Sequence, residues 1–205
     1  MGTVYVVDDD ESFLRAASRL LRASGFDVKT YVSADELLTR GFDSDHGCIV
    51  SDLNMPGMNG LDLQAALASK HHSIPLIFLT GAGDIPSTVI AMKSGAVDFL
   101  EKRAPKEKLL EAVHRALSQS KEERAERVRK RKLHEMFARL SERELEVLQH
   151  VVEGKMNKEI AADLDIHERT VKLHRTAITT KLRVQSVAEL TRLWLEVGAS
   201  TKIAS

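Results

Sequence analysis

Short apolar runs alternate with segments of helical periodicity through residues 1–117. The runs are VYVV at 4–7, VKTY at 28–31, CIV at 48–50, LIFL at 76–79 and VDFL at 97–100. Most of them are nearly continuous in apolar residues, which is typical of strands covered on both faces. Because a helical pattern follows each run, we expect an α/β fold with a doubly wound, five-stranded parallel sheet.

A long helix is expected next, from about residue 105 to 135. Its apolar stripe consists of Leu109, Leu110, Val113 and Leu117. No Gly or Pro interrupts the segment after Pro105, and its glutamates can pair with bases at helical spacing, which favours a largely solvated linker helix. The basic stretch RVRKRK at 127–132 leaves a nucleic-acid patch as the alternative.

Residues 140–198 carry start and stop signals for four shorter helices. Ser141 to Glu144 has the spacing of a capping box, and Gly154 follows the last apolar position of the first helix. Asn157 is the expected cap of the second helix; the third spans residues 168 to about 182, and Ser186 caps the fourth. Two short helices joined by a tight turn, the second of them basic, predict a helix-turn-helix.

The composition is that of an ordinary globular protein, with 43% hydrophobic and 29% charged residues among 205. No apolar run reaches the roughly 18 residues of a membrane span, and no secretory signal pattern opens the chain. The single cysteine, Cys48, lies in an apolar run, which indicates a small core residue and excludes an internal disulfide. We therefore expect a cytoplasmic protein with no membrane partner.

The net charge is zero but unevenly distributed. Residues 1–117 hold 12 Lys and Arg against 16 Asp and Glu, residues 118–139 hold 8 against 4, and residues 140–205 hold 10 against 10. Because the first segment is acidic, the second basic and the third neutral, we expect the three segments to have different roles. We expect domains at 1–117 and 140–205, with 118–139 as a helical linker that continues the last helix of the first domain.

Polar side chains follow four of the predicted strands at the points where the strands end. Asp8 and Asp9 follow the first strand, Asp52 the third, Thr80 the fourth and Lys102 the fifth. Ligands of doubly wound sheets bind at the carboxyl ends of the strands, so we expect these groups to lie together. Helix capping does not explain three clustered carboxylates, because such carboxylates repel one another.

A hard divalent cation such as Mg²⁺ (or Mn²⁺) would relieve that repulsion, because it binds carboxylates, water and phosphate oxygens. A hydroxyl and an ammonium at the same edge suit a phosphoryl group. Neither GxxxxGK nor GxGxxG occurs in the chain, which argues against a nucleotide held by a glycine-rich loop. The strand ends therefore predict a site for a metal ion and a phosphoryl group.

The stretches VVDDDES, SDLNMPGMNG, LTGAGD and DFLEK resemble a response-regulator receiver domain over residues 3 to about 117. The resemblance implies a flavodoxin-like fold in which Asp52 is the phosphoacceptor. It also implies a metal site made by Asp8, Asp9, Asp52 and the backbone carbonyl of Asn54. An aspartate can act as a nucleophile toward phosphorus, and a bound cation offsets the charge that develops on the phosphoryl oxygens.

The same resemblance implies that Thr80 and Lys102 contact the phosphoryl group and that Phe99 is a switch aromatic. Plain core packing at a strand end is the alternative for Phe99. One departure concerns Lys102, because the family has Lys-Pro here whereas this chain has Lys102-Arg103 with the proline at position 105. The Lys102–Arg103 bond is therefore either trans, or cis at a cost of roughly 2.5–4 kcal/mol.

The stretch LSERELEVLQHVVEGKMNKEIAADLDIHERTVKLHRTAITTKL resembles a LuxR-type DNA-binding module of FixJ- and NarL-like regulators, over residues 140 to about 198. The resemblance implies that Lys172 and Leu173 face the major groove. The implied positions near the DNA backbone are Asn157, Lys158, Thr170 and Arg175. Thr176 and Lys181 complete the polar, basic face of the third helix.

We therefore expect a two-domain response regulator and transcription factor. A sensor histidine kinase would phosphorylate Asp52, and a phosphorylated homodimer would bind double-stranded DNA at two half-sites, with RNA polymerase as a further partner. One alternative is a phosphatase, which needs a general acid two residues after the nucleophile, where this chain has Asn54; no turnover enzyme is expected. The other alternative is a constitutive DNA-binding protein whose receiver serves only for dimerisation.

Overall fold

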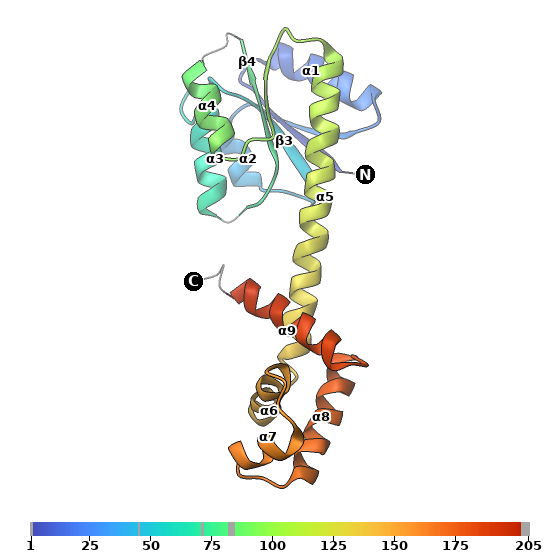
Figure 1. Cartoon of the computed structure of the whole chain (residues 1–205). Helices are drawn as coiled ribbons and strands as arrows, with labels where there is room; N and C mark the ends of the chain where they lie inside the picture. Colours follow the sequence, from blue (N-terminus) through green and yellow to red (C-terminus); the bar gives the residue numbers. More distant parts are fainter. Residues whose placement is uncertain (1, 45, 71, 82–84, 202–205) are drawn as a thin grey trace. The chain divides into compact units, whose positions relative to one another are not determined.

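The computed structural model describes residues 2–44, 46–70, 72–81 and 85–201. The chain forms two compact units, Met1–Ala125 and Glu126–Ser205, and helix α5, Lys106–Phe137, contributes residues to both (Figure 1). Among the described residues, no helix is both long enough and apolar enough to cross a membrane. The boundaries expected after residues 117 and 139 stay predictions. Residues 82–84 of the LTGAGD stretch, and the last residues of the 140–205 segment, 202–205, lie outside the described part of the chain.

The first unit is built on a five-stranded parallel sheet of order β2-β1-β3-β4-β5, as predicted. The strands are β1 Thr3–Val7, β2 Asp27–Tyr31, β3 Gly47–Asp52, β4 Leu76–Thr80 and β5 Asp98–Glu101. The helices between them are α1 Glu11–Ala23, α2 Ala34–Arg40, α3 Gly60–Ser69 and α4 Ile85–Lys93.

Each central strand is buried on both faces, which explains its continuous apolar run. In β1, Val4 and Val6 belong to one hydrophobic cluster, and Tyr5 and Val7 belong to the other. Helices α1 and α5 pack on the first cluster, whereas α2, α3 and α4 pack on the second (Figure 1). Because side chains alternate along a strand, each residue from Val4 to Val7 packs into one of the two helix-covered clusters.

Strand register brings the carboxyl ends of β1 and β3 to the same level. Val7 is the register partner of both Tyr31 in β2 and Ser51 in β3. The chain order of the sheet reverses at β1, so the residues that follow Val7 and Ser51 stand at the switch point where ligands of such sheets bind.

Helix α5 is anchored to the first unit well beyond residue 117. The Gly47 N–H donates to Ser120 Oγ at 3.1 Å, and Ser120 is buried. One helical turn further along α5, the Glu123 carboxylate accepts a hydrogen bond from Ser73 Oγ at 2.7 Å. The start of the expected linker at 118–139 therefore packs as part of the first unit.

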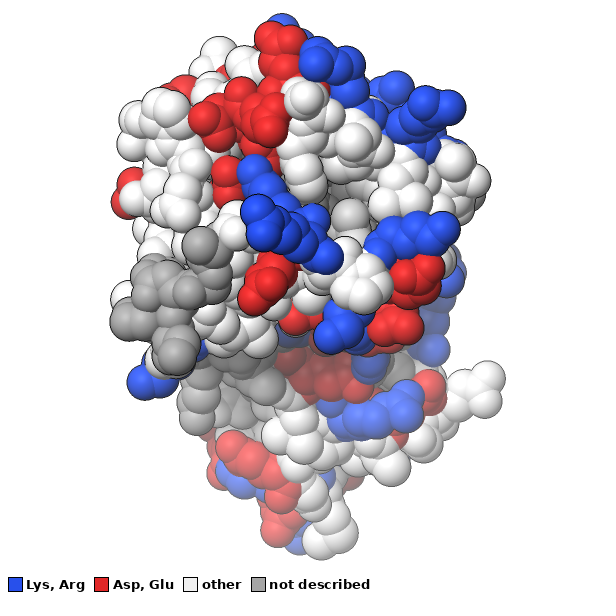
Figure 2. Space-filling view, turned by 90° about the horizontal axis from the view of Figure 1, so that it is seen from above, with Lys and Arg blue, Asp and Glu red and all other residues white. Residues whose placement is uncertain are grey.

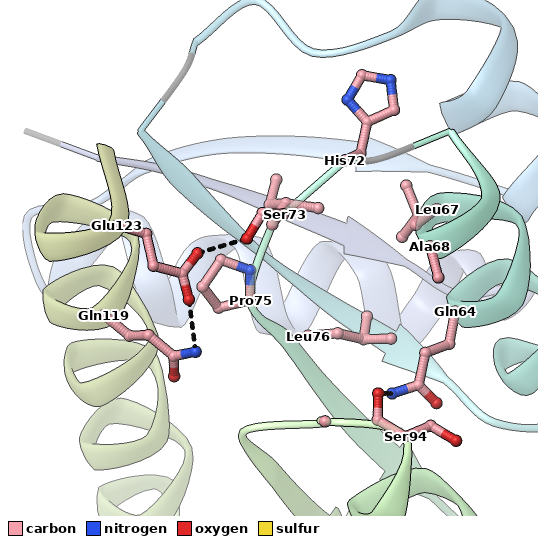
Figure 3. Close-up of a pocket in the computed structure, with 12 residues that line it drawn as sticks. Gln64, Leu67, Ala68, His72, Ser73, Pro75, Leu76, Ser94, Gln119 and Glu123 are labelled. Carbon is pink, nitrogen blue, oxygen red and sulfur yellow. Dashed lines mark hydrogen bonds between the residues drawn. The ribbon is translucent and has the colours of Figure 1, made fainter. Parts of the chain in front are cut away.

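A pocket of about 190 Å³ lies beside this anchor, between the end of α3, the start of β4 and α5 (Figure 3). Glu123 accepts hydrogen bonds from Ser73 and Gln119 on one wall, and Gln64 donates to the Ser94 carbonyl on the other. Its floor includes Leu76, at the amino end of β4, so the pocket lies at the opposite end of the sheet from the strand-end carboxylates.

The second unit is helical, with α6 Glu142–Val152, α7 Asn157–Asp163, α8 Glu168–Leu182 and α9 Val187–Thr201. The four helices and the helix-turn-helix arrangement of α7 and α8 agree with the sequence pattern. The last turns of α5 add Leu133 and Phe137 to the buried core of this unit, and the Phe137 ring lies 6.1 Å from the Trp194 ring. The far end of the expected linker thus belongs to the second core.

The helix caps agree with the sequence signals at α6 and α9 but not at α7. Ser141 and Glu144 form the expected capping box, and Ser186 Oγ accepts from the Glu189 N–H. The expectation that Asn157 caps α7 is wrong: Met156 is the N-cap, and Asn157 is the first helical residue. The side chain of Asn157 instead accepts a hydrogen bond from the tertiary neighbour Arg175.

Candidate functional site

Three carboxylates meet at the carboxyl edge of the sheet. Asp8 directly follows β1, and Asp52 is the last residue of the neighbouring strand β3. One oxygen from each of Asp8, Asp9 and Asp52 lies within 4.8 Å of the others. Asp8 and Asp52 are buried whereas Asp9 is exposed, so the cluster is open to solvent on the Asp9 side. Figure 2, which looks onto the upper end of Figure 1, shows acidic side chains beside basic ones on this face.

Lys102 reaches across the sheet edge to the buried carboxylates. Its Nζ lies 2.6 Å from Asp8 Oδ2 and 2.9 Å from Asp52 Oδ2. Burial disfavours the charged ammonium, but the hydrogen bonds to the two carboxylates outweigh that effect and raise the pKa of Lys102. The described residues contain no cis peptide bond, so the Lys102–Arg103 bond is trans, which answers the question left open by the sequence.

Asp8 is fully buried within the cluster. Burial raises the pKa of its carboxyl group, and the hydrogen bonds from Lys102 and from the Asp10 N–H only partly oppose that rise. Asp8 Oδ2 is buried and, apart from its close contact with the Lys102 ammonium, receives no hydrogen bond of good geometry. Buried Asp8 stands beside two further carboxylates, and carboxylate oxygens open to solvent on one side are ligands that Mg²⁺ prefers. The residues present therefore fit a divalent cation.

Thr80 and Asn54 flank the cluster. Thr80 is fully buried at the end of β4, and its backbone carbonyl accepts from the Lys102 N–H at 2.8 Å, which fixes the start of the segment that carries the ammonium. The Asn54 N–H points toward Asp52 Oδ1 at 3.4 Å, in the loop after β3. Asn54 thus lies next to Asp52, and Thr80 follows Leu79, the register partner of Asp52 in the neighbouring strand.

Phe99 lies in the edge strand β5 and is half-buried. Its ring centroid is 6.2 Å from that of Phe78, and it packs against the hydrophobic cluster under α2, α3 and α4. This packing is compatible with either reading of Phe99, so its role as a switch stays a prediction.

Two residues at the site carry no obvious sequence signal for their roles. Gly60 is required because a Cβ there would lie 2.6 Å from the Asp52 carbonyl oxygen and 2.8 Å from the Phe78 ring. Phe13, in α1, lies beneath Lys102, with the ammonium 4.7 Å from its ring centroid. A glycine at the first position of a helix is the only hint of Gly60; Phe13 looks like any other apolar position of α1.

Helix α8 presents a mixed polar and apolar face to solvent. Its buried side consists of Val171, Ile178 and Leu182, as the periodicity predicted. On the outer side Lys172 and Thr176 are exposed, and Leu173 is 64% exposed. The exposure of Lys172, Leu173 and Thr176 is compatible with the expected DNA contacts, which stay predictions.

The remaining candidate DNA contacts differ in their exposure and in the hydrogen bonds that their side chains make. Lys158 is exposed and Thr170 is half-buried. Arg175 Nη1 donates to Asn157 Oδ1 at 3.0 Å. Lys181 Nζ donates to both oxygens of the buried Glu144 carboxylate, at 2.8 and 2.6 Å. That contact favours a structural role for Lys181, and its predicted DNA contact requires a separate test.

Comparison with known proteins decides the family. Residues 4–114 match the response regulator receiver domain, and residues 138–194 match the bacterial regulatory proteins of the luxR family. The chain belongs to the LuxR-type response regulators. It is thus a transcription-regulating protein of a two-component system.

This response regulator resembles its relatives over nearly its whole length. It is 42% identical over 192 residues to the response regulator protein TodT of Pseudomonas putida, which covers 94% of this chain and 85% of that protein. It is 40% identical over 196 residues to the transcriptional regulatory protein FixJ of Rhizobium meliloti, which covers 96% of each chain. The structure of the response regulator StyR matches with a TM-score of 0.88 at 44% identity, over 95% of this chain and 98% of that chain.

Proposed function

We propose that Asp52 accepts a phosphoryl group from the phosphohistidine of a sensor kinase. A carboxylate oxygen of Asp52 would attack phosphorus, the P–N bond would break, and the histidine nitrogen would keep the electron pair and take a proton from solvent. The observation that carries the proposal is the meeting of Asp8, Asp9 and Asp52 with the Lys102 ammonium at one strand edge.

A Mg²⁺ (or Mn²⁺) ion belongs to the proposal, held by Asp8, Asp9, Asp52 and the Asn54 carbonyl. When bound, the ion would offset negative charge on the phosphoryl oxygens. Lys102 holds Asp52 in place and supplies a second positive charge, and the Thr80 hydroxyl would bind a phosphoryl oxygen. Movement of Thr80 toward that oxygen would open space for Phe99, which would then alter the surface around α4 and β5.

The proposed output is control of dimerisation and sequence-specific DNA binding. A phosphorylated homodimer would place two copies of α8 on two half-sites of double-stranded DNA and would then act on RNA polymerase. We place this activity in the cytoplasm and assign no turnover chemistry to the protein beyond slow loss of its own phosphoryl group. The residue two positions after Asp52 is Asn54, which lacks the general acid that an aspartate-nucleophile phosphatase needs.

The test is phosphorylation with a small phosphodonor, acetyl phosphate, followed by intact-protein mass measurement. Wild-type protein should gain one phosphoryl group in Mg²⁺ and none in excess chelator. Asp52→Asn should gain none, whereas Asp35→Asn, which changes an exposed acid in α2, should behave as wild type. Labelling of Asp52→Asn at the wild-type rate would refute the assignment of the phosphoacceptor.

A further inference from the structure

Arg175 is held by a neutral side chain rather than by a carboxylate. It lies on α8, half-buried, and its Nη1 donates to Asn157 Oδ1 at the start of α7, at 3.0 Å. Its side chain lines a small cavity with Val151 and Leu190. Arg175 thus borders a cavity with apolar residues, while its guanidinium is hydrogen-bonded to the preceding helix.

This arrangement contrasts with the other partly buried bases of the second unit. Arg143 pairs with Glu146, Lys155 with Asp163, and Lys181 with Glu144. Among the residues that the structure describes, no carboxylate forms an ion pair with Arg175. An amide satisfies one guanidinium N–H without cancelling its charge, and a partly buried charge left unneutralised favours binding of an external anion.

Asn157 is free to make this contact because it does not cap its own helix. The N-cap is Met156, whose N–H donates to the Glu159 carboxylate at 2.7 Å. A cap would have committed the Asn157 oxygen to a backbone N–H of α7. Its oxygen instead accepts from Arg175.

We propose that Asn157 is a positioning residue that holds the Arg175 guanidinium ready to bind a DNA phosphate while leaving its full positive charge available. The proposal rests on DNA binding by the second unit and adds a role to it: Asn157 acts through Arg175. One N–H of the guanidinium is used by Asn157, and the remaining donors can meet a phosphate in the bidentate geometry that arginine prefers.

Substitution by aspartate separates this role from a purely structural one. Asn157→Asp would bind the guanidinium more strongly and so preserve or improve the packing of α7 on α8. It would also neutralise Arg175 and place a negative charge next to the phosphate. A structural role therefore predicts unchanged or tighter DNA binding for Asn157→Asp, whereas a positioning role predicts a loss larger than that of Asn157→Ala.

The experiment measures the affinity of the full-length protein for a fluorescein-labelled duplex of random sequence, by anisotropy, between about 50 and 200 mM salt. All variants are kept in the same phosphorylation state. Arg175→Ala should reduce the slope of log affinity against log salt by about 0.9, the value of one phosphate contact. Asn157→Asp should reduce the slope by a similar amount. Asn157→Ala should lower affinity about three- to tenfold but change the slope by less than half as much, because the charge is retained.

The double variant Asn157→Ala/Arg175→Ala provides the decisive comparison. If Asn157 acts through Arg175, the double variant should bind no more weakly than Arg175→Ala alone. Additive losses, or wild-type affinity in Asn157→Asp, would overturn the proposal. Thermal unfolding followed by the emission of Trp194, the chain's single tryptophan, checks that each variant is folded. If the wild-type protein showed no salt-dependent binding at all, the DNA-binding function would fail instead, which is a different result.

Discussion

Replacement of Glu144 by alanine should destabilise the second unit more than replacement of an ordinary surface residue would. Glu144 is only 5% exposed, and its carboxylate accepts hydrogen bonds from Lys181 and from the Ser141 N–H at 2.7 Å. It therefore ties the start of α6 to the end of α8. We expect Glu144→Ala to lose both the capping contact and the ion pair.

The magnitude follows from these two contacts. Loss of one partner of a capping box costs about 0.5–1 kcal/mol. A hydrogen bond to a charged group contributes about 1.5–3 kcal/mol, but the Lys181 side chain is 38% exposed, so solvent screening reduces its share to about 1–1.5 kcal/mol. The expected total is about 2 kcal/mol, or roughly 8–16 °C in Tm for a unit of this size.

The pH dependence provides an independent check. The hydrogen bonds from Lys181, and then that from the Ser141 N–H, hold the pKa of Glu144 below its usual range. Because the folded-state pKa is lowered, the stabilisation is fully present above the unfolded value of about 4.3 and is lost as the pH falls through the folded value. The difference in unfolding free energy between wild type and Glu144→Gln should thus stay constant from about pH 7 to 5 and shrink at lower pH.

The assay is urea unfolding followed by the fluorescence of Trp194, which packs on Phe137 in the same unit. Glu142→Ala is the matched control, because Glu142 is an exposed acid in the first turn of the same helix, and its loss should cost less than about 0.5 kcal/mol. A loss below about 0.5 kcal/mol for Glu144→Ala, or an effect equal to that of the control, would refute the reasoning.

Further outcomes are expected elsewhere in the chain. Lys181→Met should destabilise the second unit without changing the salt slope of DNA binding, and a slope reduced by about 0.9 would instead show that Lys181 contacts phosphate. Lys172→Ala should lower affinity about tenfold for DNA selected from a random pool by the wild-type protein, with phosphorylation intact; equal affinity would remove it from the contact set. Asp8→Asn should weaken Mg²⁺ binding, measured by calorimetry, at least about tenfold. Asp10→Asn is the control and should bind Mg²⁺ as the wild type does, because asparagine also caps α1. Equal losses in the two variants would contradict the assigned ligands. Cys48 should resist thiol reagents in the native protein and react fully in urea, since burial raises its pKa to about 12; rapid native labelling would show that β3 opens.

The first unit was largely predictable because its signals are periodic. Near-continuous apolar runs identified strands buried on both faces, and parallel strands place their carboxyl ends at one edge. That rule alone predicts Asp8, Asp52 and Thr80 at the same end of the sheet. The position of the Lys102 ammonium did not follow from the sequence, because it depends on the conformation of the Lys102–Arg103 bond and on a long side chain that spans two strands.

Tertiary contacts overrode local signals in the second half of the chain. Asn157 has the best cap chemistry near the start of α7, yet it contacts Arg175, 18 residues away, because the two helices pack together. The sequence predicts Lys181 on the basic face of α8, yet its ammonium donates to the carboxylate of Glu144, 37 residues earlier in the chain. Leu133 and Phe137, in the segment expected to be a largely solvated linker helix, belong to the buried core of the second unit, where Phe137 packs against Trp194 of α9.

The sequence by itself thus determined the two domain types, the strand-end carboxylates and the helix-turn-helix, because each depends on periodicity or on residues a few positions apart. Only the tertiary structure decided which charges are neutralised: carboxylates pair with Lys102 and Lys181, whereas no carboxylate of the described residues pairs with Arg175. The physical reason is that ion pairing depends on distances of a few ångströms between side chains far apart in sequence, and only the packing of the elements sets those distances.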